Sequence, residues 1–187
     1  MTNSPEPAPS GPATAVRAAV VVVSDRCAAG TAADLSGPRA RIALEAAGLS
    51  VAPVRIVPDG AASVAAALGA CLAAGARVVV TSGGTGVGPR DRTPEGTVGL
   101  IERELPGLAE ALRREGARLV PTAVLSRGLV GVTAGGAVLV NLPGSPAGVE
   151  QGLAVLLPLL PHLLDQLAGG DHARSERHAQ HEADGRG

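Results

Sequence analysis

Continuous apolar runs, rather than alternating ones, mark the strands that this sequence predicts. Each run is short and rich in β-branched residues, as in strands buried on both faces, and they cover residues 18–23, 51–57, 78–80 and 137–140. Helical segments between and after them are predicted at residues 38–47, 60–74, 95–104, 108–115 and from 145 onward, the last divided by Pro158 and Pro161. The pattern predicts an α/β fold, a three-layer sandwich whose mostly parallel sheet is covered by helices on both faces.

Three finer expectations concern a helix face, a hairpin and a helix cap. Within the helix predicted at residues 38–47, Ile42, Leu44 and Ala46 are expected nearer the core, and the charged side chains are expected to face water. Residues 131–136 are expected to form a small hairpin. Ser145 is expected to cap the last helix, with Pro146 in its first turn.

The two ends of the chain differ in composition from its middle. Residues 1–15 hold four prolines and few apolar side chains, and residues 169–187 are polar, so both are predicted to be disordered. The remaining residues, 16–168, suit a single domain. The sequence shows neither a secretory signal pattern nor an apolar stretch that would span a membrane, and a cytoplasmic location is expected.

Charge and aromatic content argue against nucleic acid as a partner. The formal net charge is −1, and the chain contains no Phe, Tyr or Trp. It therefore predicts no basic stripe for phosphate backbones and no platform on which bases could stack. A planar ligand would have to lie against peptide planes, aliphatic side chains or an arginine.

The strongest chemical signal follows the strand predicted at residues 78–80. The chain there reads Thr-Ser-Gly-Gly-Thr-Gly-Val-Gly-Pro-Arg-Asp-Arg-Thr-Pro over residues 81–94. Thr93 is expected to cap a helix that has Pro94 at its first position. A strand, a glycine-rich loop and a helix N-terminus together form an anion site, because unpaired N–H groups point at one spot. Arg90 and Arg92 add positive charge, and Asp91 is a candidate metal ligand or acid/base.

Two common phosphate loops are excluded by the residues present. A Walker loop requires a lysine, and this chain has none. The dinucleotide fingerprint fails because Pro89 stands where its third glycine belongs.

The remaining pattern resembles the signature of the molybdenum cofactor biosynthesis domain family, of the Mog and MoaB type. Four further blocks resemble that family in the same order, at residues 24–37, 57–59, 121–127 and 141–146. Four of the five blocks begin where a predicted strand ends. Loops at the carboxyl ends of parallel strands meet at one rim, so a single pocket is expected there.

The resemblance implies a reaction and a set of residues. The active branch of the family transfers AMP from ATP to the terminal phosphate of molybdopterin and releases pyrophosphate. By this resemblance Asp59 and Asp91 are the catalytic residues and hold Mg²⁺. The residues expected to contact substrate or phosphate are Ser24, Asp25, Ser82, Gly83, Gly84, Thr85, Gly86, Arg90, Thr93, Gly144 and Ser145.

The resemblance further implies a homotrimer or a hexamer built from two trimers, with hand-over of the product to a molybdenum insertase. The rival reading is a non-catalytic carrier that binds molybdopterin. One departure stands out, since the family commonly has a second acidic residue after the Pro-Asp of its second loop, where this chain has Gly60. That change would weaken Mg²⁺ binding if the missing carboxylate is a ligand.

Plainer roles remain open for several of these side chains. Asp59 could cap the following helix, Asp91 could pair with Arg90 or Arg92, and Asp25 and Asp34 could order their own loops. Cys71 is expected in the core, and Cys27 is either reactive or a bystander. His162 is expected in the core or an interface, and the histidines of the tail, His172, His178 and His181, are expected to be solvated rather than metal ligands.

Overall fold

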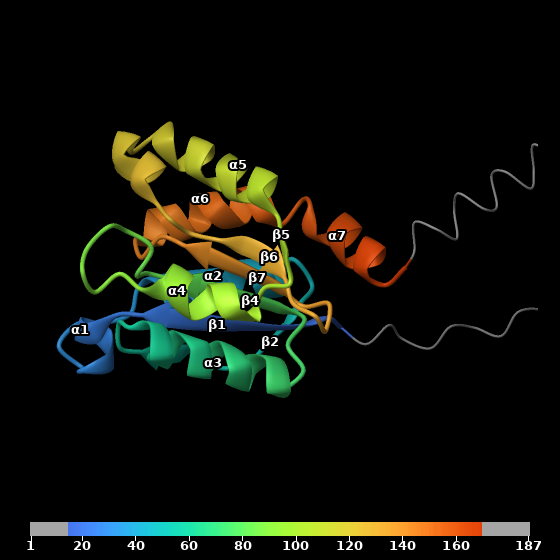
Figure 1. Ribbon diagram of the computed structural model, residues 1–187, viewed down its shortest axis with the longest axis horizontal. Helices are drawn as coiled ribbons and strands as arrows, with labels where there is room; N and C mark the ends of the chain where they lie inside the picture. The colour runs from blue at the N-terminus through green and yellow to red at the C-terminus, as the bar shows by residue number, and fades with distance from the viewer. Residues whose placement is uncertain (1–14, 170–187) are drawn as a thin grey trace, which may run out of the picture.

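The computed structural model describes residues 15–169. The lead-in and tail expected to be disordered therefore lie outside the described residues, apart from Ala15 and Gly169. The described chain alternates strands and helices around one mixed sheet (Figure 1). The expected α/β sandwich is confirmed.

Three long parallel strands form the middle of the sheet. They are β1 (Arg17–Val23), β4 (Val78–Ser82) and β7 (Val138–Leu142), and the register places Val20 beside Val80 and Val80 beside Val140. Two short strands, β2 (Ser50–Val51) and β3 (Arg55–Val57), pair in parallel with the outer side of β1. On the other side β6 (Val130–Val132) and β5 (Arg103–Glu104) complete the order β2-β1-β4-β7-β6-β5 as antiparallel strands.

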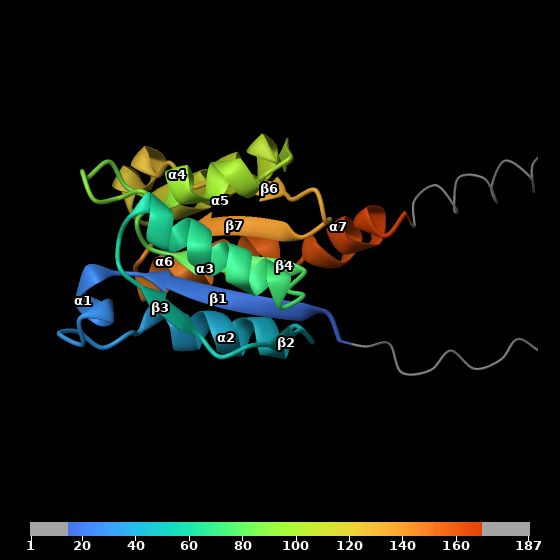
Figure 2. The same cartoon turned by 60° about the horizontal axis from the view of Figure 1, so that its bottom comes forward.

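Helices cover both faces of this sheet (Figures 1 and 2). Alternate β1 side chains separate two cores, with Val20 and Val22 in one and Val21 and Val23 in the other. The first core lies under α2 (Ser36–Ala46), α5 (Pro106–Ala117), α6 (Pro146–Leu156) and α7 (Leu160–Leu167). The second lies under α3 (Ala61–Ala73), beside which pack the short α4 (Thr93–Thr97) and the 3₁₀ turn η1 (Val98–Leu100). Strands buried on both faces have no polar side, which explains the continuous apolar runs.

The helix expected at residues 95–104 is wrong in its second half. The helical turn stops at Leu100, and the chain then extends into the edge strand β5. Pairing with β6 explains the difference, because the Glu102 N–H donates to the Val132 carbonyl and the Leu105 N–H to the Val130 carbonyl. The expected strand at residues 51–57 is likewise two short strands rather than one.

Two other expectations meet different outcomes. The hairpin is confirmed, with β6 and β7 as its strands and a turn containing Gly136 at a φ of 74°. The expected inner face of α2 is confirmed for Leu44, which is buried, but is wrong for Ile42, which is 64% exposed, and for Ala46, which is exposed; Ala40 is buried instead. The helix begins at Ser36, so its buried stripe follows the spacing of residues 37, 40 and 44.

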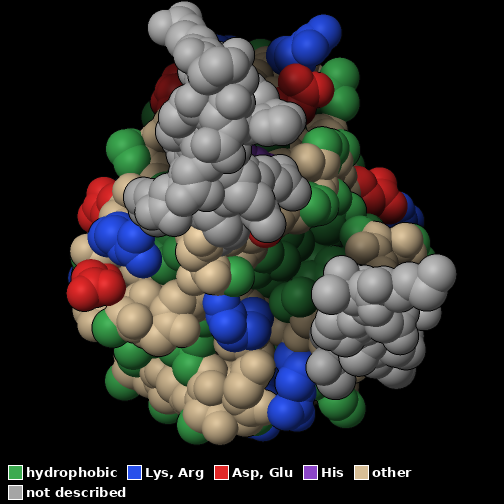
Figure 3. All heavy atoms as spheres, turned by 90° about the vertical axis from the view of Figure 1, so that its right-hand side faces the viewer, with side chains coloured by type: hydrophobic (Ala, Val, Ile, Leu, Met, Phe, Trp, Pro, Cys, Tyr) green, Lys and Arg blue, Asp and Glu red, His purple; other side chains and the backbone are tan. Residues whose placement is uncertain are grey.

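The charge distribution on the surface and the lengths of the helices bear on nucleic acid and on membranes as partners. At the end of the molecule near α7, the described part of Figure 3 shows basic side chains scattered among acidic, apolar and uncharged ones. Within residues 15–169 no single helix is both long enough and apolar enough to cross a membrane. Only α6 and α7 taken together meet that length and composition, and the two helices are bent by 57° relative to each other.

Candidate active site

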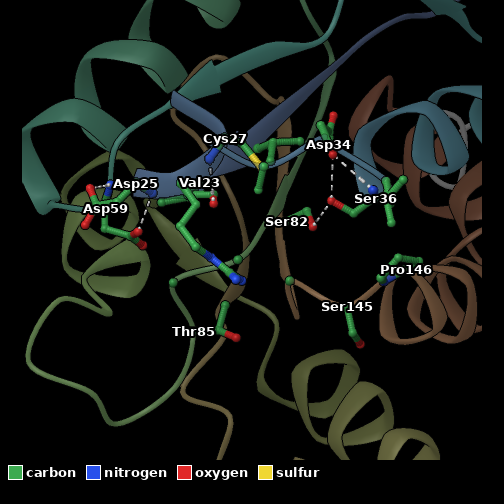
Figure 4. Close-up of a pocket in the computed structure, with 18 of the residues that line it drawn as sticks. Val23, Asp25, Cys27, Asp34, Ser36, Asp59, Ser82, Thr85, Ser145 and Pro146 are labelled. Atoms are coloured by element: carbon green, nitrogen blue, oxygen red, sulfur yellow. Dashed lines mark hydrogen bonds between the residues drawn. The ribbon is translucent and has the colours of Figure 1, made fainter. Parts of the chain in front are cut away.

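A pocket of about 690 Å³ opens where β1, β3, β4 and β7 end (Figure 4). The predicted convergence of the strand-end loops is therefore what the structure shows. Of the predicted site residues, all except Arg90 and Thr93 line this pocket. Those that do are Ser24, Asp25, Asp59, Ser82, Gly83, Gly84, Thr85, Gly86, Asp91, Gly144 and Ser145.

One side of the pocket is formed by two aspartates that hold each other. The Asp25 N–H donates to Asp59 Oδ2 at 2.8 Å, and the Asp59 N–H donates to Asp25 Oδ1 at 3.1 Å. Arg90 joins them, since its Nε and Nη2 donate to the Asp25 carboxylate at 3.0 and 2.8 Å. These bonds lower the pKa of Asp25, the Arg90 guanidinium having the largest effect. Asp59 is not a helix cap, because Gly60 occupies that position before α3.

The glycines of the loop after β4 make room for carboxylates. Gly84 has a φ of 63°, and a Cβ there would lie 3.3 Å from Asp59 Oδ1 and would collide with Thr93 Oγ1. A Cβ at Gly86 or Gly88 would come within 2.8 or 2.7 Å of Asp91 Oδ2. The loop therefore lies close against Asp59 and Asp91, and a side chain at Gly86 or Gly88 would displace the Asp91 carboxylate.

Asp91 closes its own loop rather than pairing with a neighbouring arginine. Its Oδ2 accepts from the Gly88 N–H at 2.9 Å, and its own N–H donates to the Gly88 carbonyl at 3.1 Å. Arg90, one of the two expected partners, turns to Asp25 instead. The carboxylate of Asp91 thus sits at the pocket wall with its backbone and side chain both fixed.

Thr93 does not cap α4, and that expectation is wrong. Arg92 occupies the cap position without a side-chain bond, while Thr93 is fully buried. Its Oγ1 donates to the Gly83 carbonyl at 2.8 Å and so anchors the start of the loop from beneath. Its side chain supports the pocket rather than lining it.

The opposite side of the pocket is formed by two helix N-termini (Figure 4). Asp34 orders its own loop, which is the plainer role expected for it. Its Oδ1 accepts from the Ser36 and Gly37 N–H groups at 3.0 and 2.9 Å at the start of α2. Ser145 caps α6 as predicted, accepting from the Gly148 N–H at 3.1 Å. Ser82 lies between them, its Oγ 3.0 Å from Ser36 Oγ and 3.1 Å from the Pro143 carbonyl oxygen. Both helix dipoles favour negative charge in the pocket.

A second pocket of about 270 Å³ lies between α5, α6 and the 3₁₀ segment η2 (Pro121–Leu125). It shares Thr85, Gly86 and Ser145 with the first pocket. Its walls are largely aliphatic, with one cation, and include Ala109, Leu112, Arg113, Val120, Leu125 and Leu142. A polar and an apolar pocket thus meet at the glycine-rich loop.

Comparison with known proteins agrees with the motifs. Residues 19–162 match the family described as a probable molybdopterin binding domain. The chain belongs to this family. The solved molybdopterin biosynthesis Mog protein from Mycobacterium ulcerans is 44% identical, with a TM-score of 0.78 over 84% of this chain and 99% of that one.

Two curated relatives extend the comparison of this molybdopterin binding domain. A molybdenum cofactor biosynthesis bifunctional protein of Synechococcus elongatus is 43% identical over 169 residues, 90% of this chain and 53% of that protein. A molybdopterin adenylyltransferase of Haemophilus influenzae is 37% identical over 139 residues, 72% of this chain and 69% of that protein. The chain spans about half the length of the bifunctional relatives it matches.

Two supporting residues of the molybdopterin binding domain had no role in the sequence analysis. Asn141 is buried, donates from Nδ2 to Thr81 and Thr97 Oγ1 at 3.1 Å each, and accepts from the Leu129 N–H at 3.2 Å. Arg127 reaches across to the glycine-rich loop, donating from Nε to the Gly86 carbonyl at 2.7 Å. An Asn amid a strand and an Arg inside a motif block are the signals that could have drawn attention to them.

The remaining cysteine and histidine expectations have separate outcomes. Cys71 is a core residue as expected, and its burial raises the pKa of the thiol. Cys27 lines the first pocket. His162 is exposed on α7, so a core position is wrong, while His172, His178 and His181 lie outside the described residues. Within residues 15–169 no three His, Cys, Asp or Glu side chains gather as a metal cluster.

Proposed function

We propose that this protein is a molybdopterin adenylyltransferase, which transfers AMP from ATP to the terminal phosphate of molybdopterin and releases pyrophosphate. The observation that carries the proposal is the placement of Asp59 and Asp91 against a glycine-rich loop between a polar and an aliphatic pocket. The relative from Haemophilus influenzae, which bears that name, supports it.

The two pockets suit the two substrates. The polar pocket offers backbone N–H groups, two helix N-termini and Arg90 at its edge, and it would receive the phosphates of ATP. The aliphatic pocket, with Arg113 in its wall, would receive the pterin ring. Thr85, Gly86 and Ser145 border both, so the terminal phosphate of the pterin would meet the α-phosphate of ATP beside them.

The reaction exchanges one phosphorus–oxygen bond for another. An oxygen of the molybdopterin phosphate attacks the α-phosphorus, and the bond to pyrophosphate breaks with its electron pair leaving on pyrophosphate. The attacking phosphate is already ionised at neutral pH, so alignment and charge stabilisation matter more than proton removal. The loop N–H groups and nearby arginines would supply that stabilisation.

Mg²⁺ fits the donor set of this site. The hard carboxylate oxygens of Asp59 and Asp91 are ligands that this ion prefers, and it is commonly held by one or two carboxylates plus substrate phosphates. When bound, the ion would neutralise phosphate charge, while Asp59 and Asp91 hold it at the pocket wall.

The test is direct. Purified protein is incubated with molybdopterin, ATP and Mg²⁺, and adenylylated pterin is measured by mass together with released pyrophosphate. Product in the wild type, with losses of at least about 100-fold in Asp59→Asn and Asp91→Asn, supports the proposal. Full activity in both variants would contradict the roles assigned to Asp59 and Asp91. Tight pterin binding without product would instead indicate a non-catalytic carrier.

The assembly follows as a second part of the proposal. We propose that residues 16–168 form the domain that associates as a homotrimer, or as a hexamer built from two trimers, in the cytoplasm and passes its product to a molybdenum insertase. Exposed apolar side chains that could be covered on association include Ile42, Leu119, Val124 and Leu159. Light scattering of the purified chain measures the assembly, and a monomer at micromolar concentration would contradict it.

A further inference from the structure

Arg127 bonds at several points to the segment that holds the glycine-rich loop. Its backbone N–H donates to the Thr85 carbonyl at 2.8 Å, and its Nε donates to the Gly86 carbonyl at 2.7 Å. Its Nη2 donates to the Asp91 carbonyl, and Nη1 pairs with the Glu95 carboxylate. One residue from beyond η2 therefore contacts both ends of the stretch from residue 86 to residue 91.

The stretch depends on such a link because regular structure does not hold it. Between the end of β4 at Ser82 and the start of α4 at Thr93 the chain forms neither helix nor strand. Inside the loop, Gly88 and Asp91 bond to each other. From outside, Arg90 ties the stretch to Asp25, and Arg127 ties it to the segment after η2. A planar guanidinium with donors in several directions lets Arg127 serve Gly86, Asp91 and Glu95 together.

The position of Arg127 also relates the two pockets. Its chain neighbours Ser126 and Gly128 line the aliphatic pocket. The loop to which its side chain bonds lines the polar pocket. Its ion pair with Glu95 is partly exposed, at 37% and 36% of the two side chains, so the pair by itself contributes little to stability. The bonds to the two loop carbonyls are the distinctive part of the arrangement.

We propose that Arg127 is a positioning residue, which fixes the glycine-rich loop and the Asp91 carboxylate in the geometry required for transfer. This inference rests on the proposed adenylyl transfer. Arg127 lies behind the loop and acts through Gly86 and Asp91 rather than on the substrate. A displacement of a catalytic group by about 1 Å can cost about 100-fold in rate.

The experiment compares Arg127→Met with Arg41→Met. Arg41 pairs with Glu45 on α2 at 2.8 Å, with side chains 47% and 42% exposed, and that pair bonds to no loop carbonyl. We expect Arg127→Met to lower kcat by about 30- to 100-fold with the KM for ATP changed less than about threefold. Arg41→Met should stay within about twofold of the wild type.

Two further variants separate positioning from ion pairing. Arg127→Lys should recover only part of the lost kcat, because an ammonium cannot reach the three partners in their separate directions. Glu95→Gln leaves the bonds to Gly86 and Asp91 in place and should cost no more than about threefold. A Glu95→Gln loss as large as that of Arg127→Met would overturn the proposal.

Hydrogen exchange supplies a readout that does not need the reaction. In the absence of ligands, amides of residues 86–92 should exchange faster in Arg127→Met than in the wild type or Arg41→Met, with α3 and α6 unchanged. Unchanged loop exchange, or an unchanged kcat, would overturn the positioning role. A wild type that makes no product would defeat the proposed function alone, since the exchange result would still decide the role of Arg127 in holding the loop.

Discussion

Asp25 and Asp59 each donate a backbone N–H to the carboxylate of the other, across the ends of β1 and β3. This reciprocal pair links the two strand-end loops through two backbone-to-carboxylate hydrogen bonds. It leaves Asp59 Oδ1 directed toward Gly84 in the glycine-rich loop. The carboxylate that the proposed reaction needs is therefore held by the backbone of the neighbouring loop.

The pairing of Asp25 with Arg90 predicts a pH dependence. The pKa of Asp25 is lowered, chiefly by the hydrogen bond from Arg90, so its contribution to stability is complete above the unfolded pKa of about 4. That contribution is lost as the pH falls through the lower folded pKa. We expect the Tm difference between wild type and Asp25→Asn to be constant from about pH 5 to 8 and to shrink below about pH 4.

The exposed position of the pair supplies a control. Asp25 and Arg90 side chains are 45% and 67% exposed, so the Tm difference should also shrink in high salt. Calorimetry over pH and salt measures both trends. A difference that widens below pH 4 would contradict the assignment.

Gly84→Ala should disrupt the loop. A Cβ at a φ of 63° is strained, and here it would also meet the Thr93 hydroxyl that anchors Gly83. We expect the free energy of unfolding to fall by about 1–3 kcal/mol and nucleotide affinity to fall with it.

The matched control is Gly69→Ala. Gly69 lies within α3 with open space where a Cβ would stand, so alanine should stabilise the protein by about 0.5–1 kcal/mol. Urea unfolding and nucleotide titration of both variants provide the comparison. If the two variants changed unfolding free energy and nucleotide affinity equally, the loop conformation of Gly84 would have no specific role in either.

Gly60→Asp should not restore a useful second carboxylate. Gly60 has a φ of 141°, a conformation that other residues rarely adopt, and Ser63 Oγ lies close to where its side chain would begin. We expect the variant to lose about 1–3 kcal/mol of unfolding free energy without a rise in transfer rate. Urea unfolding and pyrophosphate release measure the two quantities, and a stable, faster variant would show that the loop can adopt another backbone.

Asn141→Ala should be strongly destabilising. It removes the buried partner of Thr81, Thr97 and the Leu129 N–H together, and unpaired buried polar groups cost about 1–3 kcal/mol each. We expect a loss of about 2–4 kcal/mol in urea unfolding, after partial relaxation. Thr31→Ala, which removes an exposed hydroxyl bonded to the Arg26 carbonyl, should change stability by less than about 0.5 kcal/mol.

The sequence predicted the sheet and the rim of the pocket because both depend on local chemistry. Continuous β-branched runs indicate strands such as β1 and β4, and the glycines after them indicate loops that only small residues can form. Ser145 was predicted as a cap from its position before Pro146, and the structure agrees.

The differences arise where distant contacts decide. Thr93 has the sequence position of a cap, but its hydroxyl donates to the carbonyl of Gly83, ten residues earlier, and Arg92 occupies the cap position. Residues 101–104 leave a helical pattern because β6, some thirty residues later, offers hydrogen-bond partners. Arg127 becomes a neighbour of the loop only through the path of the chain after α5, which spacing along the sequence does not reveal.

The second pocket has an aliphatic lining in a chain without aromatic side chains, which bears on how ligand binding can be measured. The chain has no Phe, Tyr or Trp, so it contributes almost no absorbance or fluorescence in the near ultraviolet. The colour and emission of a bound pterin ring would come from the ring alone, without energy transfer from neighbouring side chains. Titrations can therefore read the ligand directly, and a tryptophan introduced beside η2 would be the single optical probe of the whole chain.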